Sequence, residues 1–217
     1  MNQILNFGFI NDNSLSSNKY KKTIFKYKFL LFSSISFLMI FIFYYLFLYF
    51  KAVKISKLSN QILNTYDIQR LYSSNYLESK PSIVLENGES AEILGFISIS
   101  SINLRYPILS NISEDFLRIA PCKFYGQNLN DIGNFCIAGH NYDNGEFFSN
   151  LRLLNIDDYI EIYNLDGSFI SYKIYDIFET NKYDISCTSQ DTSSKEITLI
   201  TCNNINGNRL IIKAKNR

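Results

Sequence analysis

The sequence predicts an all-β domain, a barrel or a sandwich of seven or eight short strands, preceded by one N-terminal transmembrane helix. From about residue 87 onward, short runs rich in β-branched and aromatic residues alternate with turn residues, which is typical of barrels and sandwiches. Residues 29–50 carry no charge and are almost entirely apolar, as expected of a segment that crosses a bilayer.

Composition excludes several classes of protein. The chain has 217 residues, enough for one globular domain and additional segments. Hydrophobic residues make up 47% of it, too many for a wholly disordered protein. The formal net charge of +1 argues against a general nucleic-acid binder. The single histidine excludes a metal site built from several imidazoles.

Charge is unevenly distributed along the chain. Residues 1–28 carry a net charge of +4 and residues 51–80 a net charge of +3, whereas residues 81–217 carry −6. An acidic C-terminal domain is poorly suited to binding phosphate backbones, so we expect no nucleic-acid partner.

The apolar run Phe29–Phe50 is predicted to be an uncleaved signal anchor. As a helix its 22 residues would extend over roughly 33 Å, the thickness of a bilayer core. A buried core helix is disfavoured because such helices are seldom apolar all round. A cleaved signal peptide would need a small-x-small site, and Phe50–Lys54 offers none that is convincing.

The flanks of this run predict its orientation. Five lysines precede it and three follow closely, which favours a cytoplasmic N-terminus and an extracellular C-terminal domain. We therefore expect a single-pass membrane protein with four parts. They are a cytoplasmic segment (1–28), the anchor (29–50), a stalk or linker (51–86) and the folded domain (87–217).

Seven runs in the last part are predicted to be strands. Asp166-Gly167 and Asn206-Gly207 each separate two of them and are typical of hairpin turns. Two short helices are expected, at Ser113–Ile119 and at Glu146–Leu154. The predicted strands are Ile93–Ser98, Ile102–Leu109, Asn134–Gly139, Tyr159–Tyr163, Phe169–Phe178, Glu196–Cys202 and Arg209–Lys213.

Three residues are candidates for chemistry: His140, Cys202 and Arg209. Taken singly, each has an ordinary explanation, as a surface histidine, a small buried residue and an edge charge. An antiparallel hairpin around Asn206-Gly207, however, pairs Cys202 with Arg209 if opposed residue numbers sum to 411. Directly opposed side chains share one face of a sheet, so a thiol and a guanidinium would project together.

These residues lie in segments that resemble the sortase family, the cysteine transpeptidases of Gram-positive surfaces. Thr198–Cys202 (TLITC) matches the family's TLxTC signature at every fixed position. Gly133–His140 resembles its GNxxIAGH strand. Gly95–Ile99 and Tyr106–Leu109 resemble its first two strands. The resemblance covers roughly residues 90–215 and implies a closed seven- to eight-stranded β-barrel with short helices.

The resemblance implies roles for the three candidates. Cys202 would attack a peptide carbonyl as a thiolate and form a thioacyl enzyme. His140 would protonate the leaving amine and then deprotonate the incoming one. Arg209 would donate hydrogen bonds to the oxyanion or to backbone carbonyls of the substrate.

The resemblance also implies a substrate-binding region. Glu179–Lys195 would be the loop that holds the substrate, with Tyr183 and Ile185 as its main apolar side chains. Thr201 and Ala138, close to the candidates in sequence, would be further substrate-binding residues.

The implied partners are those of a surface enzyme. They are surface proteins with an LPxTG-like C-terminal sorting signal, and an acceptor amine on a peptidoglycan precursor or a pilin. No cofactor is expected; part of the family binds calcium, but no ligands are identifiable here.

Several alternatives remain open. The short loop and the missing Asp-Pro-Phe/Trp lid motif favour a class resembling A, D or E, whereas Asn141–Gly145 resembles class B. An L,D-transpeptidase normally has an arginine two residues after its cysteine, and none is present here. A membrane-tethered β-domain that binds a partner without catalysis is the other alternative.

The remaining three cysteines also leave choices open, because four cysteines permit three pairings. Cys136 is interpreted as a packing residue, because strand alternation places it on the same face as Ala138 and His140. A disulfide between Cys187 and Cys202 that inactivates the enzyme is a further hypothesis. Cys122 has no assigned role.

Overall fold

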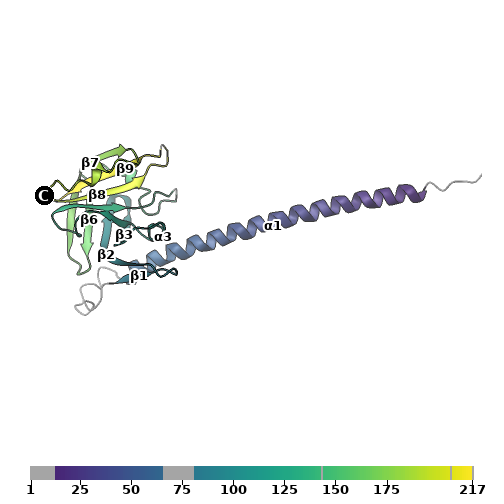
Figure 1. Cartoon of the computed structure of the whole chain (residues 1–217), viewed down its shortest axis with the longest axis horizontal. Helices are drawn as coiled ribbons and strands as arrows, with labels where there is room; N and C mark the ends of the chain where they lie inside the picture. Colours follow the sequence, from purple (N-terminus) through teal and green to yellow (C-terminus); the bar gives the residue numbers. More distant parts are fainter. Residues whose placement is uncertain (1–12, 66–80, 143, 206, 217) are drawn as a thin grey trace, which may run out of the picture. The chain divides into compact units, whose positions relative to one another are not determined.

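The computed structural model describes residues 13–65, 81–142, 144–205 and 207–216 (Figure 1). It divides into two compact units, Met1–Val53 and Lys54–Arg217, which are considered separately. The predicted cytoplasmic segment lies partly outside the described residues, as does the part of the predicted stalk from residue 66 to residue 80.

The first described element is the long helix α1 (Asn13–Thr65). Its stretch Ile24–Phe50 has a mean hydropathy of 2.2 and is long and apolar enough to cross a membrane. All of its side chains are exposed in the isolated chain. The predicted apolar helix over residues 29–50 is therefore confirmed as a helix.

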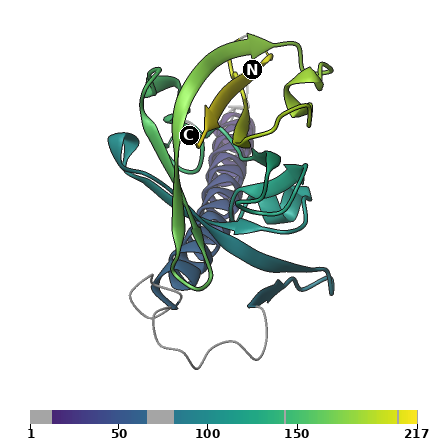
Figure 2. The ribbon, with the colours of Figure 1, turned by 90° about the vertical axis from the view of Figure 1, so that its left-hand side faces the viewer.

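The second unit is a closed β-barrel. Strands β2 to β9 form one sheet in the order β2-β3-β4-β5-β8-β9-β7-β6, and pairing of β2 with β6 closes it (Figures 1 and 2). Strand β1 adds to the outside of β2. The predicted closed barrel is confirmed. The strands are β1 (Ser82–Val84), β2 (Ser90–Ile99), β3 (Leu104–Leu109), β4 (Cys122–Tyr125), β5 (Gly133–Ala138), β6 (Tyr159–Asn164), β7 (Phe169–Thr180), β8 (Lys195–Cys202) and β9 (Arg209–Lys215).

The closing pair depends on a glycine. Gly95 of β2 faces Asn164 of β6, and a Cβ atom at residue 95 would lie 2.2 Å from the Tyr163 carbonyl oxygen. Real side chains do not approach that closely, so only glycine lets β6 come near enough to close the barrel.

Alternation along the strands separates two faces. On β8, Ile197 and Leu199 join the main core inside the barrel, whereas Ile200 belongs to a small cluster on the outer face. That outer cluster also contains Cys136 of β5 and Ile211 of β9. The two-residue period of a strand thus gives β5, β8 and β9 a second apolar face outside the core.

The helical predictions had different outcomes. Helix α3 (Glu114–Leu117) lies within the predicted Ser113–Ile119, and the Ser113 hydroxyl caps it by accepting a hydrogen bond from the Phe116 amide at 3.3 Å. The predicted helix over Glu146–Leu154 is wrong: that segment contains only the 3-10 turn η2 (Leu151–Leu153). Its first residues instead fold back on the chain, because the Phe148 amide bonds to the His140 carbonyl at 2.9 Å.

Turns lie in four of the connections between strands of the barrel. Two are the 3-10 turns η1 (Ser100–Ile102) and η3 (Ser186–Thr188), and η3 lies in the long connection between β7 and β8. Gly167 and Gly207 have φ values of 83° and 73° in the β6–β7 and β8–β9 turns, a backbone conformation that suits glycine. Asn206, in the second turn, lies outside the described residues.

Candidate active site

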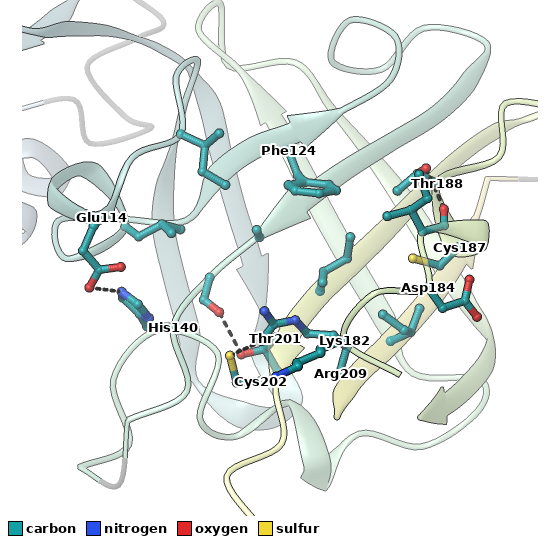
Figure 3. A pocket seen from close by; sticks show the side chains of 17 residues that line it. Glu114, Phe124, His140, Lys182, Asp184, Cys187, Thr188, Thr201, Cys202 and Arg209 are labelled. Atoms are coloured by element: carbon teal, nitrogen blue, oxygen red, sulfur yellow. Dashed lines mark hydrogen bonds and ion pairs between the residues drawn. The ribbon is translucent and has the colours of Figure 1, made fainter. Parts of the chain in front are cut away.

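A pocket of about 420 Å³ opens on the outer face of β5, β8 and β9 (Figure 3). Its floor is apolar and consists of Ala138, Ile200 and Ile211, which follow from the alternation of these strands. The candidates His140, Cys202 and Arg209 all line it. The fold therefore brings His140 to two residues of the β8–β9 hairpin that lie more than 60 residues later in the sequence.

The β8–β9 hairpin positions the thiol beside the guanidinium. Its register pairs Cys202 with Arg209 and Ile200 with Ile211, so the predicted pairing is confirmed. The Arg209 Nη1 donates a hydrogen bond to the Cys202 Sγ. The register of the hairpin therefore places a guanidinium directly against a sulfur atom that could act as a nucleophile.

Parallel pairing of β5 with β8 brings His140 to the same place. The last register pair is Ala138 with Ile200. Two residues further along, the backbone reaches His140 after β5 and Cys202 at the end of β8. The Gly139 amide bonds to the Ile200 carbonyl at 3.1 Å, which extends the pairing beyond the strand ends. Period-2 alternation therefore places the imidazole and the thiol on one face.

Two side chains hold these strand ends together. The Thr201 hydroxyl donates to the Gly139 carbonyl at 2.7 Å, and the Asn141 Nδ2 donates to the Cys202 carbonyl at 2.7 Å. Thr201 is nearly buried and Asn141 is half-buried. Thr201, which we expected to bind substrate, lines the pocket with its hydroxyl engaged in this way.

A carboxylate lies against the imidazole. The His140 Nε2 is 3.5 Å from the Glu114 Oε1, and within the described residues it makes no hydrogen bond. The same Glu114 oxygen is 3.3 Å from Arg118 Nη2, so helix α3 supplies the carboxylate and the residue that caps its C-terminus supplies a cation that holds it. The ring of Tyr142 also packs against the imidazole, with ring centroids 4.9 Å apart. In Figure 3 the imidazole lies between Glu114 and Cys202.

The β7–β8 connection forms one wall of the pocket. Its residues Lys182, Asp184 and Ile185 line the cavity together with η3. The Asp184 carboxylate accepts hydrogen bonds from the Thr180 hydroxyl and the Ser186 amide, and these lower its pKa.

The predicted substrate-binding residues are not all in the same place. Ala138 and Ile185 line the pocket. Tyr183 does not line it: the side chain is 80% exposed, and the Lys182 ammonium lies 4.9 Å from its ring centroid.

All four cysteines are free thiols. Burial raises the pKa of Cys122 and of Cys136 to about 12, and it also raises the pKa of Cys187. Cys136 packs beneath the pocket, in agreement with its interpretation as a packing residue. Cys187 and Cys202 both line the pocket without a bond between them.

Sequence reasoning missed part of the site. Glu114 and Asn141 contact the reactive residues only because the chain folds back over 26 and 61 residues. The acidic first turn of the predicted helix after Ser113 was a visible signal, but it indicated only a helix start. Within the described residues, no group of three or more His, Cys, Asp or Glu side chains has the arrangement of a metal site.

Comparisons with known proteins agree with this geometry. Residues 97–217 match the family model of the sortase domain. The chain is 28% identical over 123 residues to sortase A of Bacillus anthracis, a match that covers 55% of this chain and 57% of that protein. This chain thus spans a little over half the length of that relative.

Solved structures show the same fold. A sortase D5 transpeptidase from Clostridium perfringens is 28% identical, with a TM-score of 0.57 and coverage of 74% of this chain and 96% of that one. Sortase A from Corynebacterium diphtheriae, as a lid mutant, is 26% identical, with a TM-score of 0.55 and coverage of 61% and 74%. The family model accounts for more than half of the residues, and the chain therefore belongs to the sortase family.

Proposed function

We propose that this protein is a membrane-anchored cysteine transpeptidase. It cleaves an LPxTG-like C-terminal sorting signal and transfers the protein carrying it to an amine of the cell wall or of a pilin. The observation that carries this proposal is the pocket in which the Arg209 guanidinium bonds to the Cys202 sulfur and His140 lies on the same face. Membership of the sortase family, whose members are cell-wall transpeptidases, supports the reaction type.

The first half of the reaction breaks the peptide bond. The Cys202 thiolate attacks the carbonyl carbon, and the electron pair of the C=O bond moves to its oxygen. The forked donors of Arg209 stabilise that oxyanion. The oxyanion then collapses, the C–N bond breaks, and His140 gives its proton to the departing amine, which leaves a thioester on Cys202.

The second half regenerates the enzyme. An acceptor amine attacks the thioester carbonyl, His140 removes its proton, and the C–S bond breaks to release Cys202 as a thiolate. The new amide joins the protein to its acceptor. His140 acts first as acid and then as base, which explains how the single histidine of the chain serves both steps.

The geometry implies a direction for the bound peptide. Figure 3 shows His140 on one side of Cys202 and the residues of the β7–β8 connection on the other. The leaving amine lies on the side of its proton donor, His140. The acyl part of the sorting signal therefore lies along Lys182, Ile185 and Thr188.

The alternative is a membrane-tethered β-domain that binds a partner without catalysis. The full-length chain in detergent is to be incubated with internally quenched LPxTG-like peptides and hydroxylamine as acceptor. We expect hydroxamate products from the wild type and from Cys122→Ala, and none from Cys202→Ala or His140→Ala. The binding domain would be favoured by two negative results together. No peptide of the panel would be turned over, and a thiol-reactive sorting-peptide analogue would not label Cys202.

A further inference from the structure

Two polar side chains in the sortase-like segments are fully buried away from the reacting atoms. Asn134 lies near the start of β5 and Thr198 in the middle of β8, and both are 0% exposed. The Thr198 hydroxyl donates to the Asn134 Oδ1 at 2.8 Å. This bond fixes the orientation of the amide, because Oδ1 is the only acceptor of the Asn134 side chain.

The amide so oriented binds the β7–β8 connection. The Asn134 Nδ2 donates to the Cys187 carbonyl at 3.0 Å and to the Ser189 carbonyl at 3.1 Å. One buried side chain thus satisfies two backbone carbonyls on either side of Thr188, which itself lines the pocket. Buried carbonyls without partners are costly, so these bonds hold the connection in place.

A third side chain makes the attachment from the opposite direction. The Gln190 Oε1 accepts a hydrogen bond from the backbone N–H of Asn134 at 3.1 Å, and the Gln190 Nε2 donates to the backbone carbonyl of Asn134 at 2.8 Å. Nε2 also donates to the Thr188 carbonyl at 3.0 Å. A Cβ atom at Gly126 would lie 1.9 Å from the Asn134 carbonyl oxygen and 2.8 Å from Nε2, so a glycine at residue 126 leaves room for the carbonyl that Gln190 binds.

Apolar burial contributes little to holding this segment. Tyr183 and Ile185 are 80% and 66% exposed, and Cys187 is the only buried hydrophobic residue between residues 181 and 194. Hydrogen bonds therefore set the position of the wall along which the acyl part of the peptide is proposed to lie.

We propose that Asn134, Thr198 and Gln190 are positioning residues that preform the acyl-side wall of the pocket and thereby set the affinity for the sorting signal. This inference rests on the proposed function. It assigns a role to the first threonine of TLITC and to the asparagine of the GN pair, neither of which takes part in the reaction steps. A preformed wall binds a peptide more tightly because less ordering is required on binding.

The test compares two substitutions, each of which removes one buried hydroxyl group from a different residue. Thr198→Val removes the donor to Asn134 Oδ1, and Tyr172→Phe removes an equally buried hydroxyl that donates to Asn130 Oδ1 at 2.8 Å, away from the pocket. With the full-length chain in detergent, we expect Thr198→Val to raise the KM for the sorting peptide about three- to tenfold. We expect kcat and the rate of Cys202 alkylation by iodoacetamide to stay within about twofold of wild type, and Tyr172→Phe to leave all three unchanged.

A second measurement does not depend on turnover. Hydrogen exchange of the peptide spanning residues 182–190 should become faster in Thr198→Val and in Gln190→Ala. The Gln190 side chain is only half-buried, so its removal should leave the fold intact. Exchange of the same peptide should stay unchanged in Tyr172→Phe. The inference is overturned if Thr198→Val and Gln190→Ala both keep the wild-type KM and the wild-type exchange rate. It is also overturned if Tyr172→Phe changes the KM and the exchange rate as much as they do. Absence of wild-type turnover overturns the proposed function instead, and the exchange data still decide the positioning role.

Discussion

At the scale of single residues, burial divides the four cysteines into one accessible thiol and three enclosed ones. Cys202 is half-buried at the pocket, whereas Cys122, Cys136 and Cys187 are buried. A thiol with a pKa raised to about 12, as for Cys122 and Cys136, stays protonated at pH 8 and reacts slowly. We expect iodoacetamide at pH 8 to modify Cys202 alone in the native chain and all four in denaturant, as read by peptide mass spectrometry. Native modification of Cys122 at a comparable rate would contradict this.

The guanidinium of Arg209 is expected to need its shape as well as its charge. One of its nitrogens bonds to the Cys202 sulfur, and the others remain for an oxyanion. Because lysine is only a point charge, Arg209→Lys should lower kcat/KM by about 10²- to 10³-fold. Arg152→Lys, an exposed arginine on η2, is the matched control and should be neutral. Full activity of Arg209→Lys in steady-state cleavage would refute the forked role.

Glu114 should assist His140 by stabilising the imidazolium formed during turnover. Its carboxylate is 62% exposed, so solvent weakens the interaction, and Glu114→Gln is expected to lower kcat only about two- to fivefold. Asp115→Asn is the control, because Asp115 contacts the same Arg118 at 3.5 Å without such a contact to His140. Equal kcat values for the two variants would remove Glu114 from the mechanism.

At the scale of elements, closure of the barrel depends on the close approach of β2 and β6. A methyl group at residue 95 would meet the Tyr163 carbonyl oxygen, so Gly95→Ala should lower the free energy of unfolding by about 1–3 kcal/mol in denaturant titrations. Gly88→Ala is the comparison: its added Cβ meets nothing within 4 Å, and only the φ of +86° opposes it. A cost at Gly95 no larger than that at Gly88 would show that the closing strands adjust freely.

The elements that could be predicted are those whose signal is local. The register of the β8–β9 hairpin was predicted correctly, because alternation and a turn dipeptide together indicate a register; β8 begins one residue earlier and β9 ends two residues later than expected. Strands β1 and β4 were missed, because three or four residues are too few to show alternation, and β4 pairs with β3 through a single residue pair. The helix expected over residues 146–154 was wrong because the segment's amide bonds go back to the His140 loop.

The candidate site shows the same limit. Cys202, His140 and Arg209 were identified because each stands in a short linear pattern at a strand end. Asn134 and Thr198 stand in the same patterns, but the Asn134 side chain that Thr198 orients donates to carbonyls of a connection without periodicity, 53 and 55 residues away. Hydrogen bonds to carbonyls of such a connection leave no trace in residue spacing, so only the folded chain reveals them.

At the scale of the whole molecule, the near-zero net charge is a sum of unlike parts. A basic N-terminal segment and an apolar helix precede a part of the chain that carries a net charge of −6. Positive residues are retained on the cytoplasmic side of a membrane, whereas acidic residues contribute little to orientation. The distribution of lysines therefore favours an extracellular barrel, where sorting signals and cell-wall amines would be met.

This topology can be tested with the reactive thiol itself. We expect a membrane-impermeant thiol reagent to label Cys202 in intact cells that express the full chain, with lysozyme used to thin the wall. In a Cys202→Ala background, Ser16→Cys places a thiol before the apolar stretch Ile24–Phe50, and labelling of that thiol should then require permeabilised cells. Three lysines follow the apolar run Phe29–Phe50 closely and oppose the predicted orientation, so the result measures whether the five lysines that precede this run dominate. The predicted topology would be wrong if Ser16→Cys were labelled in intact cells while Cys202 of the wild-type chain were not. The proposed access to surface proteins would then be lost as well.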